Sequence, residues 1–444
     1  MSAILGFLTV IIMLALVMSK KASPTVALIG VPVLTGIMAS LSSTGEGAFS
    51  IFDIGKFITS GIGTVAATGV MFIFSILFFG ILTDAGTFRP IIKKILGVIG
   101  SDPVKIALGT AILAMIVHLD GSGAVTFLIC IPALIPVYDA VGMSRTTLAT
   151  IVALAAGTMN VVPWGGPTIR AATAIEMNVA ELFNPVVIPL LFGLATVLIF
   201  AFILGKKEKK RLGEINSKEI KAVEQELTEE QQALLRPNLF WINILLILAA
   251  VVGLIIGGKY GIKPEVVFMI SFVLAIVINY PEVSMQKSRV DAHAKSAILM
   301  ASVLFAAGAF TGIMKGSGMI TAMSESLVSI IPNSAAKYFA VITGIISMPA
   351  SLLFDPDSFY FGVLPVLSST AKGFGIDGVN IARAAILGQM TTGFPVSPLT
   401  PATFLLVGLS GVDFGEHQKK TIPFAFLVTI VMLIVSVAIG AIRI

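Results

Sequence analysis

Charged and polar residues interrupt two long apolar stretches of the chain. The stretch 104–140 contains His118-Leu119-Asp120-Gly121-Ser122-Gly123, and the stretch 335–372 contains Phe354-Asp355-Pro356-Asp357-Ser358. A carboxylate at the centre of an apolar segment costs about 2.5–3.5 kcal/mol on membrane-insertion scales, which calls for a compensating role. Proton or metal binding is one such role, and its candidates are Asp120, Asp355, Asp357 and His118. The alternative is structural: each Asp caps the helix that follows, and His118 is a hydrogen-bonded core residue.

Proline and glycine interrupt two further apolar stretches, 145–181 and 377–412. The first contains Pro163-Trp164-Gly165-Gly166-Pro167-Thr168, and the second contains Pro395-Val396-Ser397-Pro398-Leu399-Thr400. A break in a membrane helix frees backbone N–H and C=O groups, and a free helix N-terminus suits an anion. The breaks are therefore candidate ligand sites, with simple kinks as the alternative. Arg170, just after the first break, either reaches an anion or pairs with a neighbouring carboxylate.

We predict one substrate site where both polar tips and both breaks meet near the middle of a membrane. The tips contribute Asp120, Gly121, Ser122, Gly123, Asp355, Pro356, Asp357 and Ser358. The breaks contribute Pro163, Trp164, Gly165, Gly166, Pro167, Thr168, Arg170, Ser397, Pro398 and Thr400. Trp164 is expected to shape the wall of the site.

The composition is that of a polytopic all-α membrane protein. Hydrophobic residues make up 56% of the 444 residues and charged residues 12%, and the mean hydropathy is +1.01, which excludes a water-soluble enzyme. The single cysteine, Cys130, leaves no intramolecular disulfide or Cys/His zinc site, and we expect no covalent cofactor. Ten segments match a span of roughly 20 apolar residues: 3–19, 24–42, 60–83, 145–181, 185–204, 238–257, 264–280, 295–314, 377–412 and 421–442.

The two stretches with polar tips are predicted to be re-entrant hairpins rather than pairs of full spans. With ten spans, most Lys and Arg residues fall on one side, including Lys20, Arg89, Arg145 and the linker 205–237. The positive-inside rule makes this side cytoplasmic, so both termini are expected outside. The basic residues lie between spans and do not indicate a nucleic-acid partner.

An internal repeat relates the two parts of the chain. Gly80-Ile81-Leu82 matches Gly312-Ile313-Met314, and Pro163 matches Pro395, both 232 residues apart, while Asp120 matches Asp355 at 235. Five spans separate equivalent points, so the second copy must enter the membrane inverted, as in many secondary transporters. We predict a first repeat over 1–204, with scaffold helices in 1–100 and the hairpin and broken helix in 104–181. A cytoplasmic linker over 205–237 joins it to a second repeat over 238–444.

Three motifs make the chain resemble the citrate–metal:proton symporter family of the ion transporter superfamily. They are the runs Leu119 to Ala124, Asn160 to Ala172 and Phe354 to Gly362. The resemblance implies a bacterial plasma-membrane carrier that takes up citrate complexed with Mg²⁺ or Ca²⁺, coupled to protons. It also implies a homodimer with elevator-like motion. Ser122 departs from the pattern, because the family is expected to carry a second acidic residue there.

Other functions remain open at the level of sequence. The closest rival is a sodium- or proton-coupled carrier of a dicarboxylate or another organic acid, without metal. A channel would pass substrate without accumulating it. An intramembrane enzyme is a remote alternative, because no HExxH or GxSxG motif occurs.

Overall fold

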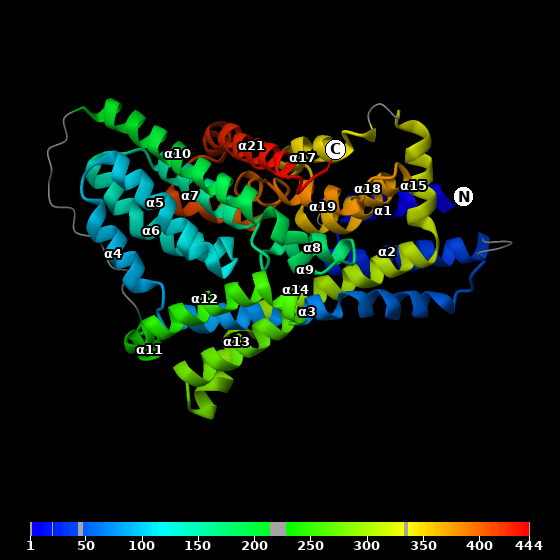
Figure 1. The fold of residues 1–444 in the computed structure, drawn as a ribbon, viewed down its shortest axis with the longest axis horizontal. Coiled ribbons are helices and arrows are strands. Elements are labelled where there is room, and N and C mark those ends of the chain that lie inside the picture. The colour runs from blue at the N-terminus through cyan, green and yellow to red at the C-terminus, as the bar shows by residue number, and fades with distance from the viewer. Residues whose placement is uncertain (1, 20, 43–47, 214–227, 333–335, 444) are drawn as a thin grey trace.

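The computed structural model describes residues 2–19, 21–42, 48–213, 228–332 and 336–443, and within them every regular element is helical (Figure 1). The first half contains α1 Ser2–Met18, α2 Pro24–Ser42, α3 Asp53–Asp84, α4 Arg89–Ile99, α5 Pro103–Val117, η1 His118–Asp120, α6 Gly123–Val141, α7 Arg145–Met159, α8 Gly166–Ala174, α9 Val179–Phe183, η2 Asn184–Val186 and α10 Val187–Leu212. The second contains α11 Glu229–Leu234, η3 Pro237–Leu239, α12 Phe240–Ile256, η4 Gly257–Tyr260, α13 Pro264–Asn279, α14 Val283–Gly316, α15 Met319–Ile330, α17 Phe339–Ala350, η5 Ser358–Val363, α18 Leu364–Gly373, α19 Gly378–Ile386, η6 Phe394–Val396, α20 Pro401–Ser410 and α21 Phe414–Ala438.

Local sequence signals set the ends of the hairpin helices. Asp102 caps α5 by accepting from the Val104 N–H at 2.8 Å, and Pro103 occupies the first helical position, where its missing N–H costs nothing. Ser122 caps α6 by accepting from the Val125 N–H. The same helix ends at Gly142, whose φ of 78° is left-handed and favours glycine.

Two long helices, α3 and α14, form an antiparallel pair whose contacts repeat the symmetry of the sequence. A Cβ added to Gly312 would lie 3.0 Å from the Gly61 Cα, so the two backbones touch there. Further along, a Cβ at Gly80 would lie 2.7 Å from the His293 ring. The repeat offset of 232 converts the Gly80–His293 contact into the Gly312–Gly61 contact. The pair therefore has the pseudo-two-fold relation expected of an inverted repeat.

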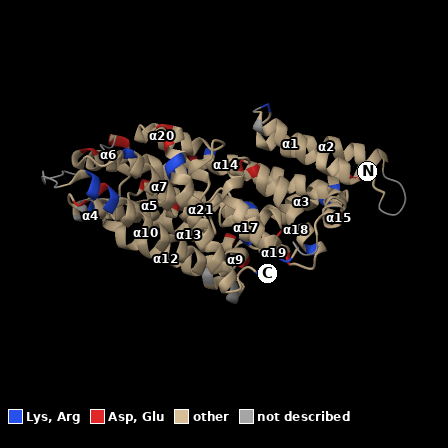
Figure 2. Ribbon diagram, turned by 90° about the horizontal axis from the view of Figure 1, so that it is seen from above, with Lys and Arg blue, Asp and Glu red and all other residues tan. Residues whose placement is uncertain are grey.

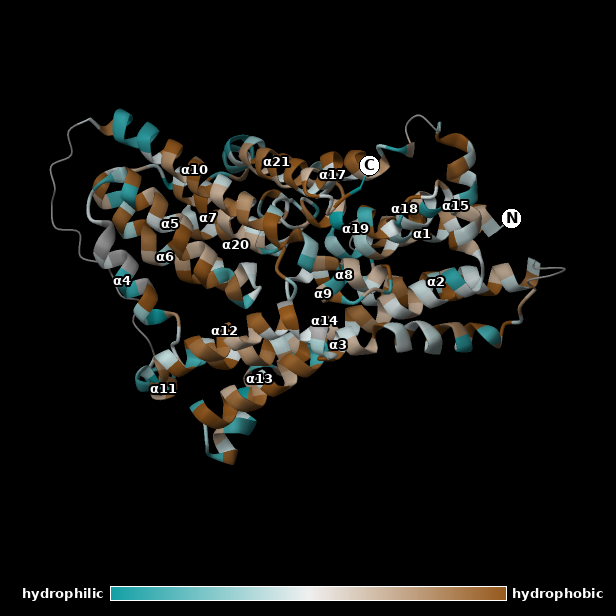
Figure 3. Ribbon diagram, viewed as in Figure 1, coloured by the Kyte–Doolittle hydropathy of each residue, from teal (hydrophilic) through white to brown (hydrophobic). Residues whose placement is uncertain are grey.

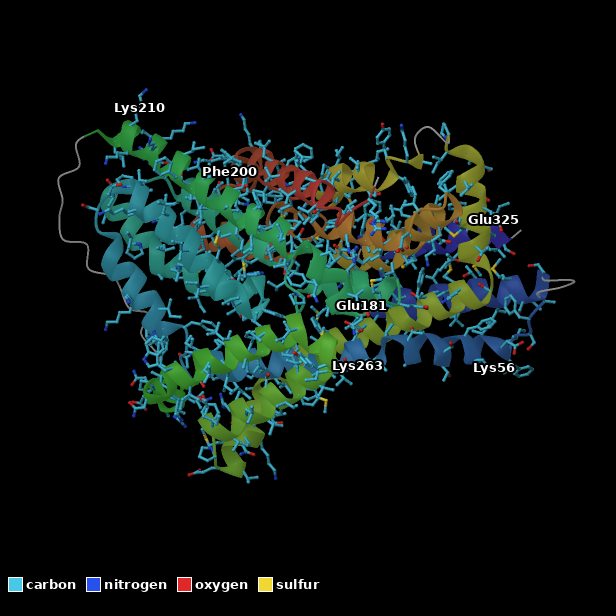
Figure 4. The ribbon with its side chains drawn as sticks, in the orientation of Figure 1. Lys56, Glu181, Phe200, Lys210, Lys263 and Glu325 are labelled. Atoms are coloured by element: carbon cyan, nitrogen blue, oxygen red, sulfur yellow. The ribbon has the colours of Figure 1, made fainter. Side chains whose placement is uncertain are left out.

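The long helices lie in two layers (Figure 1). One layer contains α2, α3, α12, α13 and α14, and the other contains the hairpin helices together with α7, α10, α19 and α21. Within this second layer α10 and α21 are antiparallel, since Phe200 packs on Phe424 at 5.0 Å and Gly193 meets Met432. The side chain of Phe200 is labelled in Figure 4. The helices α4 and α15 cross from one layer to the other at opposite ends of the molecule.

The outer surface is that of a multi-pass membrane protein. Among the described residues, eight helical stretches are long and apolar enough to span a membrane, and α1 and α13, of 17 and 16 residues, are shorter apolar helices. Leu245, Leu248 and Val252 point outward from one face of α12, a spacing that presents an apolar stripe to lipid. In Figure 3, the helices α10, α12 and α13 are largely brown, the colour of hydrophobic residues. In Figure 2, charged residues are sparse along the long helices.

The helices confirm the predicted all-α architecture with two broken helices but differ from the predicted spans in extent. The two arms of the first hairpin, Pro103–Asp120 and Gly123–Val141, are each long enough to span, so its re-entrance stays a prediction. The stretch 145–181 is broken between α7 and α8, and 377–412 between α19 and α20. The helix α14 begins at Val283 rather than at 295, and α3 begins at Asp53 rather than at 60. The amphipathic α4 and α15 lie outside every predicted span.

Parts of the predicted linker and loops fall outside the described residues: 214–227, Lys20, and residue 335 at the start of the second hairpin. The described end of the linker packs on the α2–α3 layer. The Arg236 N–H donates to the Ala85 carbonyl at 3.0 Å, and the Tyr280 hydroxyl donates to the Leu234 carbonyl at 2.9 Å.

Candidate functional site

The first polar tip is a tight turn between α5 and α6. The Asp120 Oδ1 accepts from the Ser122 N–H at 2.8 Å, so this carboxylate shapes the turn that precedes α6. Gly121 has a φ of 74°, and a Cβ there would lie 3.1 Å from the Trp164 ring. Glycine at this position thus permits both the left-handed backbone and the close approach of the first break.

The first break, between α7 and α8, packs directly on this tip. The Trp164 Nε1 donates to the Leu119 carbonyl at 2.7 Å. The indole also packs against Phe79 of α3 and Phe268 of α13, with ring centroids 5.4 and 6.0 Å away. Thr168 bridges the break itself, because its hydroxyl donates to the Val161 carbonyl at 2.8 Å. Trp164 is thus packed between the two layers, and its predicted place in the wall of a substrate site stays a prediction.

The second polar tip is organised around Asp355. Its Oδ1 accepts from the N–H groups of Asp357 at 3.0 Å and Ser358 at 3.1 Å, and its Oδ2 accepts from the Ser358 hydroxyl. The helix that follows opens with the π-helical turn η5, a widened geometry frequent at functional sites. Asp355 therefore performs the capping role that was the structural alternative, and this role does not exclude ligand binding.

The second break, between α19 and α20, is held by hydrogen bonds to the second hairpin. The Ser397 hydroxyl donates to the Ser351 carbonyl at 2.6 Å, and the Tyr360 hydroxyl donates to the Gln389 carbonyl at 2.6 Å. Within the break, the Thr400 hydroxyl donates to the Phe394 carbonyl at 2.8 Å. Pro398 is exposed, in contrast to its buried neighbour Ser397.

The two breaks also contact each other and the first tip. The Asn160 Nδ2 donates to the Met390 carbonyl at 2.8 Å. His118 lies between them: its Nδ1 is 2.8 Å from the Thr126 hydroxyl, its Nε2 is 3.5 Å from the Asn160 Oδ1, and its ring stacks on Phe394. Because both ring nitrogens have partners, the geometry favours a structural role for His118.

One ion pair joins the second tip to the first half of the chain. The Arg170 Nε on α8 donates to the Asp357 Oδ1 at 2.6 Å, and each side chain is about nine-tenths buried, with 9% and 11% of its surface exposed. Of the two roles left open for Arg170, pairing with a carboxylate is the one this structure contains. The tips of the hairpins and the two breaks thus form one connected region.

Several residues that hold this region together were missed by the sequence reasoning. Ser351, Gln389 and Tyr360 are buried and bind the second tip to the second break, and Asn160 links the breaks. Their signal in the sequence is a polar group inside an apolar run. Among the described residues, no three His, Cys, Asp or Glu side chains lie close enough together to hold a metal by themselves.

Comparison with known proteins identifies the group to which this architecture belongs. A profile of the citrate transporter family matches residues 11–388. The chain belongs to the citrate transporter family. Since the match covers both hairpins, the first break and the start of the second, it includes most of the region described above. Membership in a family of transporters excludes the intramembrane enzyme.

Relatives of the chain match it over its whole length. It is 43% identical to the citrate transporter of Bacillus subtilis (strain 168) and 40% identical to the Mg(2+)/citrate complex secondary transporter of that organism, with 100% of both chains covered in each case. Its fold is similar to that of the Alcanivorax borkumensis YdaH transporter, described as having an unusual topology. The TM-score is 0.62 at 12% identity, over 94% of this chain and 98% of the other.

Proposed function

We propose that this chain takes up citrate, as a complex with a divalent cation such as Mg²⁺ or Ca²⁺, by secondary transport across the plasma membrane of a bacterium. The observation that carries the proposal is the meeting of two polar tips and two helix breaks around the buried pair of Arg170 and Asp357, with the half-buried Asp120 and Asp355 at the tips. The full-length similarity to a Mg(2+)/citrate complex secondary transporter supports this choice of substrate.

The residues of the region suit both parts of such a substrate. Arg170 and the N-terminal end of α8 suit a carboxylate, because both present donors to an anion. Asp120, Asp355 and Asp357 offer the carboxylate oxygens that Mg²⁺ and Ca²⁺ prefer. The hydroxyls of Ser122, Ser358, Thr168, Ser397 and Thr400, with the backbone at Gly121, Gly123, Gly165, Gly166, Pro163, Pro167, Pro356 and Pro398, complete the proposed lining.

The two layers suggest how the site changes sides. We assign the layer of α2, α3, α12, α13 and α14 to a scaffold, which forms a homodimer, and the layer of hairpins and broken helices to a moving unit. The connecting helices α4 and α15 leave the scaffold at opposite ends. Movement of the unit along the scaffold, with substrate and protons bound together, would couple a cation gradient to uptake. In the orientation predicted from the basic residues, with both termini outside, the linker 205–237 lies on the cytoplasmic side.

Transport by the purified protein in liposomes tests the proposal. Labelled citrate should accumulate inside when Mg²⁺ is present and a proton gradient is imposed, and should stay near background when a chelator removes the metal. A sodium gradient in place of the proton gradient separates the two coupling ions. Uptake that is indifferent to metal would favour the rival carrier of metal-free organic acids, and equilibration without accumulation would indicate a channel.

A further inference from the structure

The ion pair between Arg170 and Asp357 is present at one of two equivalent places in the molecule. The repeat that aligns Asp120 with Asp355 puts Ser122 opposite Asp357, and the repeat that aligns Pro163 with Pro395 puts Ala402 opposite Arg170. In this first copy the tip also approaches the broken helix, because a Cβ on Gly123, next to Ser122, would lie 3.8 Å from the Ala402 Cβ.

This comparison within one chain shows that the ion pair is not needed to bring a tip against a broken helix. In the neutral copy, α6 approaches α20 through Gly123, Ala402 and the Phe394 ring. In the charged copy, η5 approaches α8 through two buried opposite charges 2.6 Å apart. A buried ion pair gains little over apolar packing, because its desolvation offsets its attraction. The charges in the second copy therefore call for a role other than packing.

A ligand that carries both signs of charge can replace both members of the pair. Opening the pair exposes a guanidinium, whose fork of donors fits a carboxylate, and a carboxylate, which fits a divalent metal. Leaving either member buried and without a partner is strongly unfavourable. A free anion would pair with Arg170 but leave the Asp357 carboxylate without a partner. A free metal ion would bind Asp357 but leave the Arg170 guanidinium without a partner.

The position of the guanidinium also suits this exchange. A Cβ on Gly166 would lie 2.8 Å from the Arg170 Nη1, so the guanidinium lies over the first turn of α8. In the part of the chain that the structure describes, no side-chain hydrogen bond caps that helix end. A carboxylate that reached Arg170 would therefore also face the positive end of the α8 dipole.

We propose that the Arg170–Asp357 pair opens on substrate binding and exchanges partners, with a substrate carboxylate on Arg170 and its divalent metal on Asp357. Because the exchange needs both a carboxylate and a metal, the pair gives the site its preference for the metal complex over the metal-free anion. This inference rests on the proposed function, since it assigns the roles of two residues within the same site.

Citrate uptake by variants in liposomes tests the exchange. The quantity measured is the ratio of the uptake rate with Mg²⁺ to the uptake rate with a chelator. Asp357→Asn removes the metal partner, and its ratio should fall at least about tenfold relative to the wild type. Arg170→Gln removes the carboxylate partner, so uptake of the complex should fall by a similar factor. The matched control is the exposed pair Asp139 and Arg145, whose variant Asp139→Asn should keep the wild-type ratio.

A double variant separates selectivity from folding. Arg170→Ala combined with Asp357→Ser copies the neutral Ala402 and Ser122, so it should fold with a near wild-type melting temperature. Its melting temperature should no longer rise with Mg²⁺ plus citrate. A wild-type ratio in Asp357→Asn, with metal-dependent uptake by the wild type, would overturn the exchange and leave the proposed function standing. Metal-independent uptake by the wild type would instead overturn the metal-complex substrate, and the exchange with it.

Discussion

The side-chain amide of Asn160 donates to the backbone carbonyl of Met390 at 2.8 Å and so ties the first helix break to the second. The two residues lie in opposite halves of the chain. Met390 has a φ of 52°, a left-handed conformation that is uncommon for a residue with a side chain. The amide therefore stabilises a backbone that the local sequence alone does not favour.

Removal of this amide should destabilise the protein. We expect Asn160→Leu, which keeps the approximate size, to lower the free energy of unfolding by about 1–3 kcal/mol, because the buried Met390 carbonyl loses its donor. Thermal unfolding of the purified protein measures the effect. Asn238→Leu, at an exposed position outside the site, is the control. Equal melting temperatures for the two variants would contradict a link between the breaks.

The crossing of α3 and α14 should tolerate no side chain at Gly312. A Cβ there would lie 2.2 Å from the Phe57 carbonyl oxygen, and backbone cannot move aside as a side chain can. Gly312→Ala should therefore cost about 1–3 kcal/mol of stability. Gly63, on α3, is a matched position: beyond its own helix, no atom of the described residues lies within 4 Å of a Cβ placed there, so Gly63→Ala should be neutral or slightly stabilising. Thermal unfolding of the two variants in detergent compares the positions directly.

The repeat related α3 to α14 from the sequence alone, but neither their contact nor the partner of Arg170 was predicted. The offset of 232 identifies Gly80 and Gly312 as equivalents, and their equivalence fixes α3 and α14 as related helices. No periodicity indicates that Arg170 of the first half meets Asp357 rather than Asp120 or Asp355, because that choice depends on how the two halves dock. For the same reason Asn160 and Gln389 appeared in the sequence only as polar residues in apolar runs.

The search for apolar spans also missed the polar first turns of some helices. The helix α14 begins with Val283 and passes through Lys287, Arg289 and His293 before its apolar part. A search for apolar spans begins only where the charges end, near 295. The short connectors α4 and α15, of 11 and 12 residues, fall below the length of a span for the same kind of reason.

Asp355 should be needed for transport beyond its structural role as a cap. Asp355→Asn keeps an oxygen that accepts from the Asp357 and Ser358 N–H groups but removes the charge. We expect uptake of citrate to fall at least about tenfold, equivalent to roughly 1.4 kcal/mol, with insertion and melting temperature little changed. If capping were the whole role of Asp355, this variant and Ser358→Ala would both transport at close to the wild-type rate.

Asp102 gives a pH-dependent prediction at the end of α5 outside the membrane spans. The hydrogen bond from Lys209, at 2.6 Å, lowers the pKa of the Asp102 carboxyl. A carboxyl with a lowered pKa in the fold contributes stability above its unfolded pKa of about 3.9, and this contribution is lost as the pH falls through the folded value.

Thermal unfolding of Asp102 variants over a range of pH measures this contribution. Asp102→Ala should cost about 1 kcal/mol at neutral pH through loss of the helix cap and its charge. The difference from the wild type should shrink in strong acid. Asp102→Asn keeps an acceptor for the Val104 N–H but cannot ionise, so its stability should lack this acid dependence. A constant difference between Asp102→Ala and wild type across the pH range would show that the ionised form contributes nothing.

A density map of the protein in a lipid nanodisc with Mg²⁺ and citrate tests most directly whether the four interruptions form the substrate site. We predict ligand density in contact with Arg170 and the α8 N-terminus, with the metal against Asp357 and the tips at Asp120 and Asp355 beside it. Ligand density elsewhere in the molecule, with the Arg170–Asp357 pair and both tips unchanged, would contradict the assignment.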